Sequence, residues 1–108
     1  MQTIARDELK ARIDRGDDTK VVEVLAENQY RQGHLPSAIN VPLGEDFDSG
    51  IENAVPDKNQ EVVVYCASKE CTASPKAARR MDELGYKRVL DYEEGKADWR
   101  EAGLPLVQ

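Results

Sequence analysis

Residues 61–81 read EVVVYCASKECTASPKAARRM, and the rest of the chain is organised around this stretch. It opens with Val62 to Tyr65, a short apolar run of β-branched and aromatic residues that is typical of a strand buried on both faces. Ser74 and Pro75 then favour a helix start, with the serine as N-cap and the proline at the first helical position. The stretch therefore predicts a strand, a loop and a helix in succession.

Cys66 is the first residue after this predicted strand. The carboxyl ends of parallel strands are where α/β sheets bind their ligands. The following helix would point its N-terminus, with unpaired N–H groups and the positive end of its dipole, back towards the loop. An anion is favoured there, either the thiolate of Cys66 or an oxyanion substrate.

The remaining chain alternates between strand and helix patterns. Strands are expected at residues 3–5, 20–25, 39–42 and 87–90. Helices are expected at residues 6–15, 27–32 and 95–102, and one weakly predicted helix comes before Pro56. Neither repeats nor linkers interrupt this order. The alternation predicts one domain over residues 1–108, an α/β three-layer sandwich (α/β/α) on a mainly parallel sheet.

Composition excludes several classes of function. The net charge of −6 argues against nucleic acid as a partner. No apolar run could span a membrane and no signal-peptide pattern opens the chain, so the sequence is expected to be soluble and cytoplasmic, with no membrane partner.

The charge is unevenly distributed along the chain. Residues 66–90 carry six cations against three anions, a local charge of +3. The cations are Lys69, Lys76, Arg79, Arg80, Lys87 and Arg88, and the anions are Glu70, Asp82 and Glu83. Two interpretations stay open, a surface for an anionic substrate or acidic partner, and an ordinary solvated helix face.

Cysteine usage indicates free thiols. Cys66 and Cys71 are the only cysteines and His34 the only histidine, too few ligands for a zinc site. In a reducing compartment a structural disulfide between the two cysteines is not expected. The sequence predicts neither a metal nor a cofactor.

Four motifs in register resemble the rhodanese-like domain. They are GHLPSAINVP at 33–42, VVYC at 63–66, GY at 85–86 and WREAGLP at 99–105. The resemblance implies about five strands and a single-domain sulfurtransferase, in which Cys66 takes sulfane sulfur from a donor and holds it as a persulfide. A nucleophilic acceptor then removes that sulfur, which is covalent, ping-pong catalysis.

The predicted substrate-binding loop follows Cys66 directly. It comprises Ala67, Ser68, Lys69, Glu70, Cys71, Thr72, Ala73 and Ser74. Inward-pointing N–H groups of such a loop form an anion nest, while the hydroxyls of Ser68 and Thr72 add donors and Lys69 adds charge at the rim. Cys66 is predicted to have a lower pKa than Cys71 and to be the more reactive thiol, because a curled loop would bring its sulfur over the N-terminus of the helix that starts at Ser74 and Pro75.

The sequence also departs from the family pattern. The loop is longer than usual and lacks the usual glycine and arginine, and Glu23-Val24-Leu25 replaces Asp-x-Arg. The missing arginine leaves the donor open between thiosulfate-like anions and persulfides. The related phosphatases need an arginine six residues after the cysteine, and Thr72 occupies that position, so a phosphatase is not expected.

The expected reactants are a small anionic sulfur donor and a thiol or cyanide-like acceptor, or an acceptor protein, acting on a monomer. Cys71 has two open interpretations, a small loop filler and a resolving thiol. Two further hypotheses follow: a thiol–disulfide or oxyanion reductase using Cys66 and Cys71, and a non-catalytic recognition module.

Four other residues are assigned structural roles. His34 is expected to be a hydrogen-bonding residue rather than a general base, because a thiolate at a helix N-terminus needs no base. Trp99 and Tyr86 are expected in the core. Glu23 interrupts a buried strand and therefore needs partners, so it is expected to support the loop rather than line a pocket.

Overall fold

The computed structural model describes residues 2–108; Met1, which the single-domain prediction includes, lies outside the described residues. Five strands form one sheet in the order β1-β5-β4-β2-β3, and every pairing between them is parallel. The strands are β1 (Gln2–Thr3), β2 (Lys20–Glu23), β3 (Ile39–Asn40), β4 (Glu61–Tyr65) and β5 (Arg88–Tyr92).

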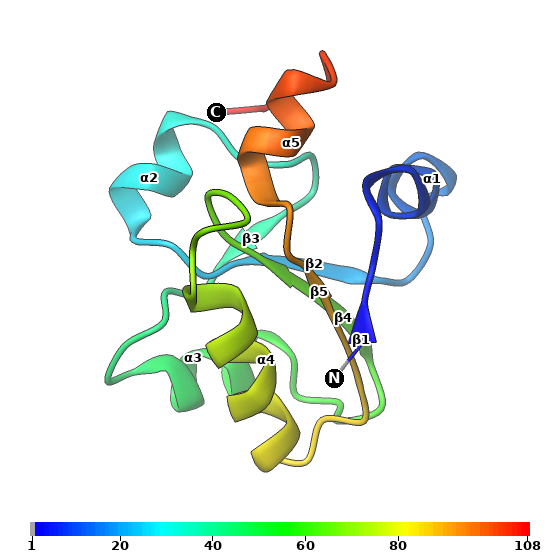
Figure 1. The fold of residues 1–108 in the computed structure, drawn as a ribbon. Helices are drawn as coiled ribbons and strands as arrows, with labels where there is room; N and C mark the ends of the chain where they lie inside the picture. Colours follow the sequence, from blue (N-terminus) through cyan, green and yellow to red (C-terminus); the bar gives the residue numbers. More distant parts are fainter. Residues whose placement is uncertain (1) are drawn as a thin grey trace.

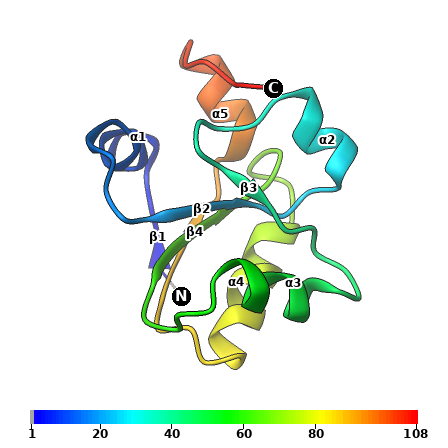
Figure 2. The same cartoon turned by 180° about the vertical axis from the view of Figure 1, so that it is seen from behind.

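Five helices cover the two faces of this sheet. They are α1 (Arg6–Arg15), α2 (Glu27–Gln32), α3 (Phe47–Ala54), α4 (Ala73–Glu83) and α5 (Gly95–Glu101). Helices α3 and α4 lie on one side of the sheet, and α1, α2 and α5 lie on the other (Figures 1 and 2). The predicted three-layer α/β/α sandwich is confirmed.

Strand β4 is central because it pairs with β2 on one side and β5 on the other. Successive side chains of a strand point to opposite faces. Val62 and Val64 therefore join the core under α3 and α4, and Val63 and Tyr65 join the core under α1 and α5. Burial on both faces is the physical basis of the uninterrupted apolar run.

Local signals placed several elements correctly. Helix α1 has the expected bounds and ends at Gly16, whose left-handed conformation (φ 71°) lets its N–H reach the carbonyls of Arg12 and Ile13. The ends of other elements differ from the predictions. Strand β1 begins one residue earlier and ends two residues earlier than predicted, although the Ile4 N–H still donates to the Asp91 carbonyl at 3.1 Å. Strand β5 runs on to Tyr92, which pairs in register with Tyr65 of β4.

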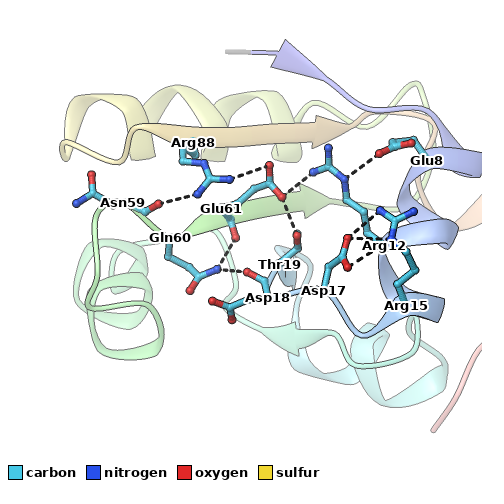
Figure 3. Close-up of polar contacts among 10 residues, drawn as sticks. All are labelled: Glu8, Arg12, Arg15, Asp17, Asp18, Thr19, Asn59, Gln60, Glu61 and Arg88. Atoms are coloured by element: carbon cyan, nitrogen blue, oxygen red, sulfur yellow. Dashed lines mark hydrogen bonds and ion pairs between the residues drawn. The ribbon is translucent and has the colours of Figure 1, made fainter.

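A polar cluster occupies the edge of the sheet where strands β2, β4 and β5 begin (Figure 3). Glu61 lies at its centre, 2.6 Å from Arg12 and 3.6 Å from Arg88, and it accepts a hydrogen bond from Thr19 at 2.7 Å. Because Glu61 opens β4 and Tyr65 ends it, this cluster lies at the opposite end of the strand from Cys66.

Among the described residues, no helix is long and apolar enough to cross a membrane.

Candidate functional site

Cys66 lies directly after the last residue of β4 and is almost fully buried, with 1% of its surface exposed. It belongs to the core between the sheet and α4, together with Val64, Ala77 and Ala78. The predicted position at the carboxyl end of a parallel strand is confirmed.

The predicted loop forms one continuous segment between β4 and α4. Lys69, Glu70 and Thr72 are exposed, whereas Ala67, Ser68, Cys71 and Ala73 are partly buried and Ser74 is buried. The Cys71 N–H donates to the Ser68 carbonyl at 3.1 Å, which closes a turn at the tip of the loop. This turn brings Cys71 back towards the end of β4.

Cys66 and Cys71 form a disulfide, with their Cα atoms 6.4 Å apart. The expectation of two free thiols is therefore wrong for this structure. The reason is the turn from Ser68 to Cys71, which places both Cα atoms within the separation of roughly 4.4–6.8 Å that a disulfide requires. The sequence showed that the two cysteines share a loop, but only the folded loop shows that they can bond.

The start of α4 also differs from the prediction. The helix begins at Ala73 with Thr72 at the N-cap position, and no side chain caps its first turn. Ser74 is not the N-cap but the second helical residue, with its side chain buried. The serine–proline signal located this helix but misplaced its start by two residues, because the helix continues the curl of the loop.

The first turn of α5 holds the beginning of the loop. The backbone N–H of Lys96 donates to the Cys66 carbonyl at 3.0 Å, and that of Ala97 donates to the Ala67 carbonyl at 2.8 Å. The N–H groups at a helix start have no partner within their own helix. Here two of them fix the backbone at Cys66 and Ala67, so the position of the sulfur depends on α5.

Gly95 permits this contact. Its φ is +71°, and a Cβ atom added to it would lie 2.6 Å from the Cys66 carbonyl oxygen and 2.8 Å from the Ser68 nitrogen. Both are backbone atoms that cannot rotate away. Only glycine therefore allows α5 to approach the loop this closely.

Replacing Gly95 with alanine is expected to cost about 3 kcal/mol or more, because steric overlap adds to the backbone strain. The matched control is Gly16→Ala, since Gly16 has the same φ of +71° and nothing within 4 Å of an added Cβ. That change is expected to cost only about 1 kcal/mol. Urea unfolding of the two variants measures the difference. Equal losses in the free energy of unfolding would show that the loop backbone moves away from an added Cβ at little cost.

Glu23 ends β2 opposite Tyr65 of β4 and is completely buried. It accepts a hydrogen bond from the Tyr65 hydroxyl at 2.8 Å and pairs with Lys96 at 3.0 Å. Lys96 Nζ also donates to the carbonyls of Gln29 and Gly33, at 3.0 and 2.8 Å. Glu23 is thus a structural carboxylate, as predicted, but it does not support the loop directly. Its partners are the side chains of Tyr65 and Lys96 rather than loop N–H groups.

Sequence reasoning missed Lys96. Its signal was the need of Glu23 for a partner, but 73 residues separate the two. A lysine in a short helix normally lies in solvent. Only the approach of α5 to the end of β2 makes it the counter-ion.

His34, Trp99 and Tyr86 have the structural roles predicted for them. The His34 ring stacks on Tyr30 with centroids 3.8 Å apart, and its Nδ1 lies 3.0 Å from the Tyr30 carbonyl oxygen. Its backbone pairs with Val107 in both directions, at 2.9 and 2.8 Å. Trp99 and Tyr86 are buried in the two cores, with 2% and 3% of their surfaces exposed.

Part of the positive charge predicted for residues 66–90 is neutralised by partners. Arg80 is held by Asp48 and Glu83, at 2.5 and 3.2 Å, and Arg88 lies near Glu61. Lys69, Lys76 and Arg79 are exposed.

Within residues 2–108, no three histidine, cysteine or acidic side chains gather where they could hold a metal ion.

Asp91 is a buried carboxylate close to this site. It pairs in register with Val64 on β4, on the sheet face that α4 covers. Among the described residues, neither of its carboxylate oxygens has a hydrogen-bond partner of good geometry. Burial raises the pKa of Asp91, and the nearby Ser74 hydroxyl lowers it only in part.

Asp91 is therefore expected to make stability fall as pH rises. Its unfolded-state pKa is about 3.9, and between that value and the higher folded-state pKa the unfolded chain loses the proton first. Asp91→Asn removes this titration, so the free energy of unfolding of the variant should rise relative to that of the wild type as the pH increases through the unfolded-state pKa and on through the raised folded-state pKa. Urea unfolding across this range tests it, and parallel curves would contradict it.

The model of the rhodanese-like domain family matches residues 5–102. The chain belongs to this family. It is 36% identical over 87 residues to the thiosulfate sulfurtransferase PspE of Escherichia coli, an alignment that covers 81% of this chain and 77% of that protein.

A longer relative and a solved structure extend the comparison. The chain is 35% identical over 103 residues to the HTH-type transcriptional regulator Rv0324 of Mycobacterium tuberculosis, covering 95% of this chain and 43% of that protein. It spans less than half the length of this and a second curated relative. The thiosulfate sulfurtransferase structure from Pseudomonas aeruginosa superimposes with a TM-score of 0.88 at 26% identity, covering all of this chain and 20% of that one.

Proposed function

We propose that this chain is a sulfurtransferase in which Cys66 carries sulfane sulfur as a persulfide. The observation that carries the proposal is the position of Cys66, at the carboxyl end of β4 and at the start of a loop that leads into α4. Its backbone is fixed by the first turn of α5. The membership of the rhodanese-like family and the names of its sulfurtransferase relatives support the same chemistry.

The reaction has two half-steps. The Cys66 thiolate attacks the sulfane sulfur of the donor, the S–S bond of the donor breaks, and the anionic remainder leaves. With thiosulfate, that remainder is sulfite. An acceptor thiolate or cyanide-like nucleophile then attacks the terminal sulfur of the persulfide and releases the Cys66 thiolate. The disulfide with Cys71 must be reduced before the first half-step.

The loop supplies binding for an anionic donor. We assign this role to the segment from Ala67 to Ser74, through its backbone N–H groups, the hydroxyls of Ser68 and Thr72, and the exposed charge of Lys69. Leu25 stands where the family has arginine, which favours persulfide donors, while the name of the PspE relative supports thiosulfate as a donor to test.

We propose that the chain acts as a single domain and a monomer, without metal or cofactor. An acceptor protein is a further candidate partner beside the small thiols. The reducing cytoplasm suits this chemistry, because Cys66 must be a free thiol at the start of each turnover.

Mass spectrometry tests the proposal. Reduced protein is incubated with thiosulfate or glutathione persulfide, and the peptide containing Cys66 is expected to gain one sulfur atom. If iodoacetamide alkylates Cys66 but neither donor adds sulfur to it, the proposal is wrong. That result would instead favour the non-catalytic recognition module.

The disulfide favours a second candidate, a thiol–disulfide or oxyanion reductase. The Cα separation of 6.4 Å between Cys66 and Cys71 permits the pair to cycle between dithiol and disulfide. Reduced protein is mixed with oxidised glutathione or an oxyanion such as arsenate, and disulfide formation is followed over time. If neither oxidant converts the dithiol to the disulfide, this candidate is wrong.

A further inference from the structure

Two sulfur atoms with different access to solvent share one loop. Cys66 is buried in the core, with 1% of its surface exposed. Cys71 is only partly buried and lies between the exposed residues Glu70 and Thr72. A reagent in solution therefore meets Cys71 more readily than Cys66.

The loop already holds the two sulfurs at bonding distance. The turn closed by the Cys71 N–H and the Ser68 carbonyl returns Cys71 to Cys66. The Cys66 carbonyl is fixed by α5, while α4 starts shortly after Cys71. Since the pair is bonded in this arrangement, a reaction between the two sulfurs needs no movement of β4 or α4.

We propose that Cys71 discharges the persulfide on Cys66 and releases sulfide, a step that rests on the sulfurtransferase function proposed above. The Cys71 thiolate attacks the Sγ atom of Cys66, and a new S–S bond forms between the two cysteines. The bond from Cys66 Sγ to the terminal sulfur breaks. That sulfur leaves with the bonding electron pair and its proton as hydrosulfide, HS⁻.

The electrons balance within the loop. The terminal sulfur is reduced from the sulfane level to sulfide, while the Cys71 thiolate and the inner persulfide sulfur of Cys66 end as a disulfide, so the step uses no external oxidant. The disulfide in the structure has the connectivity of this product. An internal thiol competes well with solution acceptors because its effective concentration is high.

Regeneration needs an external dithiol. One thiolate of the dithiol attacks the accessible sulfur of Cys71, and Cys66 leaves as the thiolate, ready for the next donor. The second thiol of the dithiol then attacks the mixed disulfide and frees Cys71. The net reaction is reduction of the donor's sulfane sulfur to sulfide, at the expense of a dithiol.

The experiment follows sulfide after a single loading. Reduced wild type and Cys71→Ser are each treated with glutathione persulfide, freed of small molecules by rapid gel filtration, and left without reductant. The wild type is expected to release one equivalent of sulfide and to contain the Cys66–Cys71 disulfide. Cys71→Ser is expected to keep the extra sulfur on Cys66 and to release sulfide only when a dithiol is added.

The possible outcomes distinguish failure of the discharge step from failure of the proposed sulfurtransferase function. If Cys71→Ser forms the Cys66 persulfide but the wild type keeps its own equally long, the discharge step is wrong and the sulfurtransferase stands. Movement of the extra sulfur to Cys71 without sulfide release also overturns the step. If neither protein gains sulfur on Cys66, the proposed function fails and this step fails with it. Circular dichroism of Cys71→Ser shows whether the fold is kept.

Discussion

Cys66→Ser is expected to lower the rate of sulfur transfer by at least about 1,000-fold. A serine hydroxyl is not ionised near neutral pH and does not form a stable bond to sulfane sulfur, so the covalent intermediate is lost. Because serine is close to cysteine in size, the buried position after β4 should tolerate it. The rate of thiocyanate formation from thiosulfate and cyanide measures the effect.

The control replaces a residue at the far edge of the sheet. Asp18 is exposed beside the polar cluster where the strands begin (Figure 3), so Asp18→Ser should keep the wild-type rate. Matching thermal unfolding curves would show that Cys66→Ser has lost chemistry and not its fold. A serine variant with the wild-type rate would place the nucleophile elsewhere, with Cys71 as the first residue to test.

Lys96→Met is expected to destabilise the fold by about 3–5 kcal/mol, the usual cost of leaving one member of a buried ion pair alone. The methionine fills the space of the lysine stem but gives nothing to Glu23, which is completely buried. The carbonyls of Gln29 and Gly33 also lose their donor. Urea unfolding measures the loss.

The matched control is Lys10→Met. Lys10 pairs with Asp14 at 2.5 Å on the exposed surface of α1, where an ion pair contributes at most about 1 kcal/mol. The double variant Glu23→Leu/Lys96→Met removes both charges and should be less destabilised than Lys96→Met alone. If Lys96→Met costs no more than Lys10→Met, the buried pair does not have the structural role assigned to it.

The buried pair also bears on the site. Lys96 holds Glu23 through its side chain and the Cys66 carbonyl through its backbone N–H. Loss of the side-chain contacts should therefore loosen the start of α5 and, with it, the backbone under the sulfur. The buried pair of Glu23 and Lys96 is thus linked to the position of the Cys66 sulfur.

The alternation of strands and helices along the chain, the three-layer class of the fold and the position of Cys66 after a strand followed from the sequence. Each rests on short-range signals that act within a few residues, such as the β-branched run before Cys66, the helical spacing of residues 6–15 and the stop at Gly16. Such signals can be read from the sequence without knowing which elements pack against one another. They predicted the α/β/α sandwich and placed the loop at the carboxyl ends of the parallel strands, and the structure confirms both.

The tertiary structure decided the rest, through the folded shape of one loop and through contacts between distant segments. The pairing of Cys66 with Cys71 depends on a turn whose closure the residue types alone do not specify. Lys96 becomes the partner of Glu23 only when α5 packs against the end of β2, and Gly95 is required only because α5 comes so close to the loop. These contacts depend on relative positions in space, which one-dimensional periodicity does not encode, since the approach of two elements is fixed by the packing of the whole core.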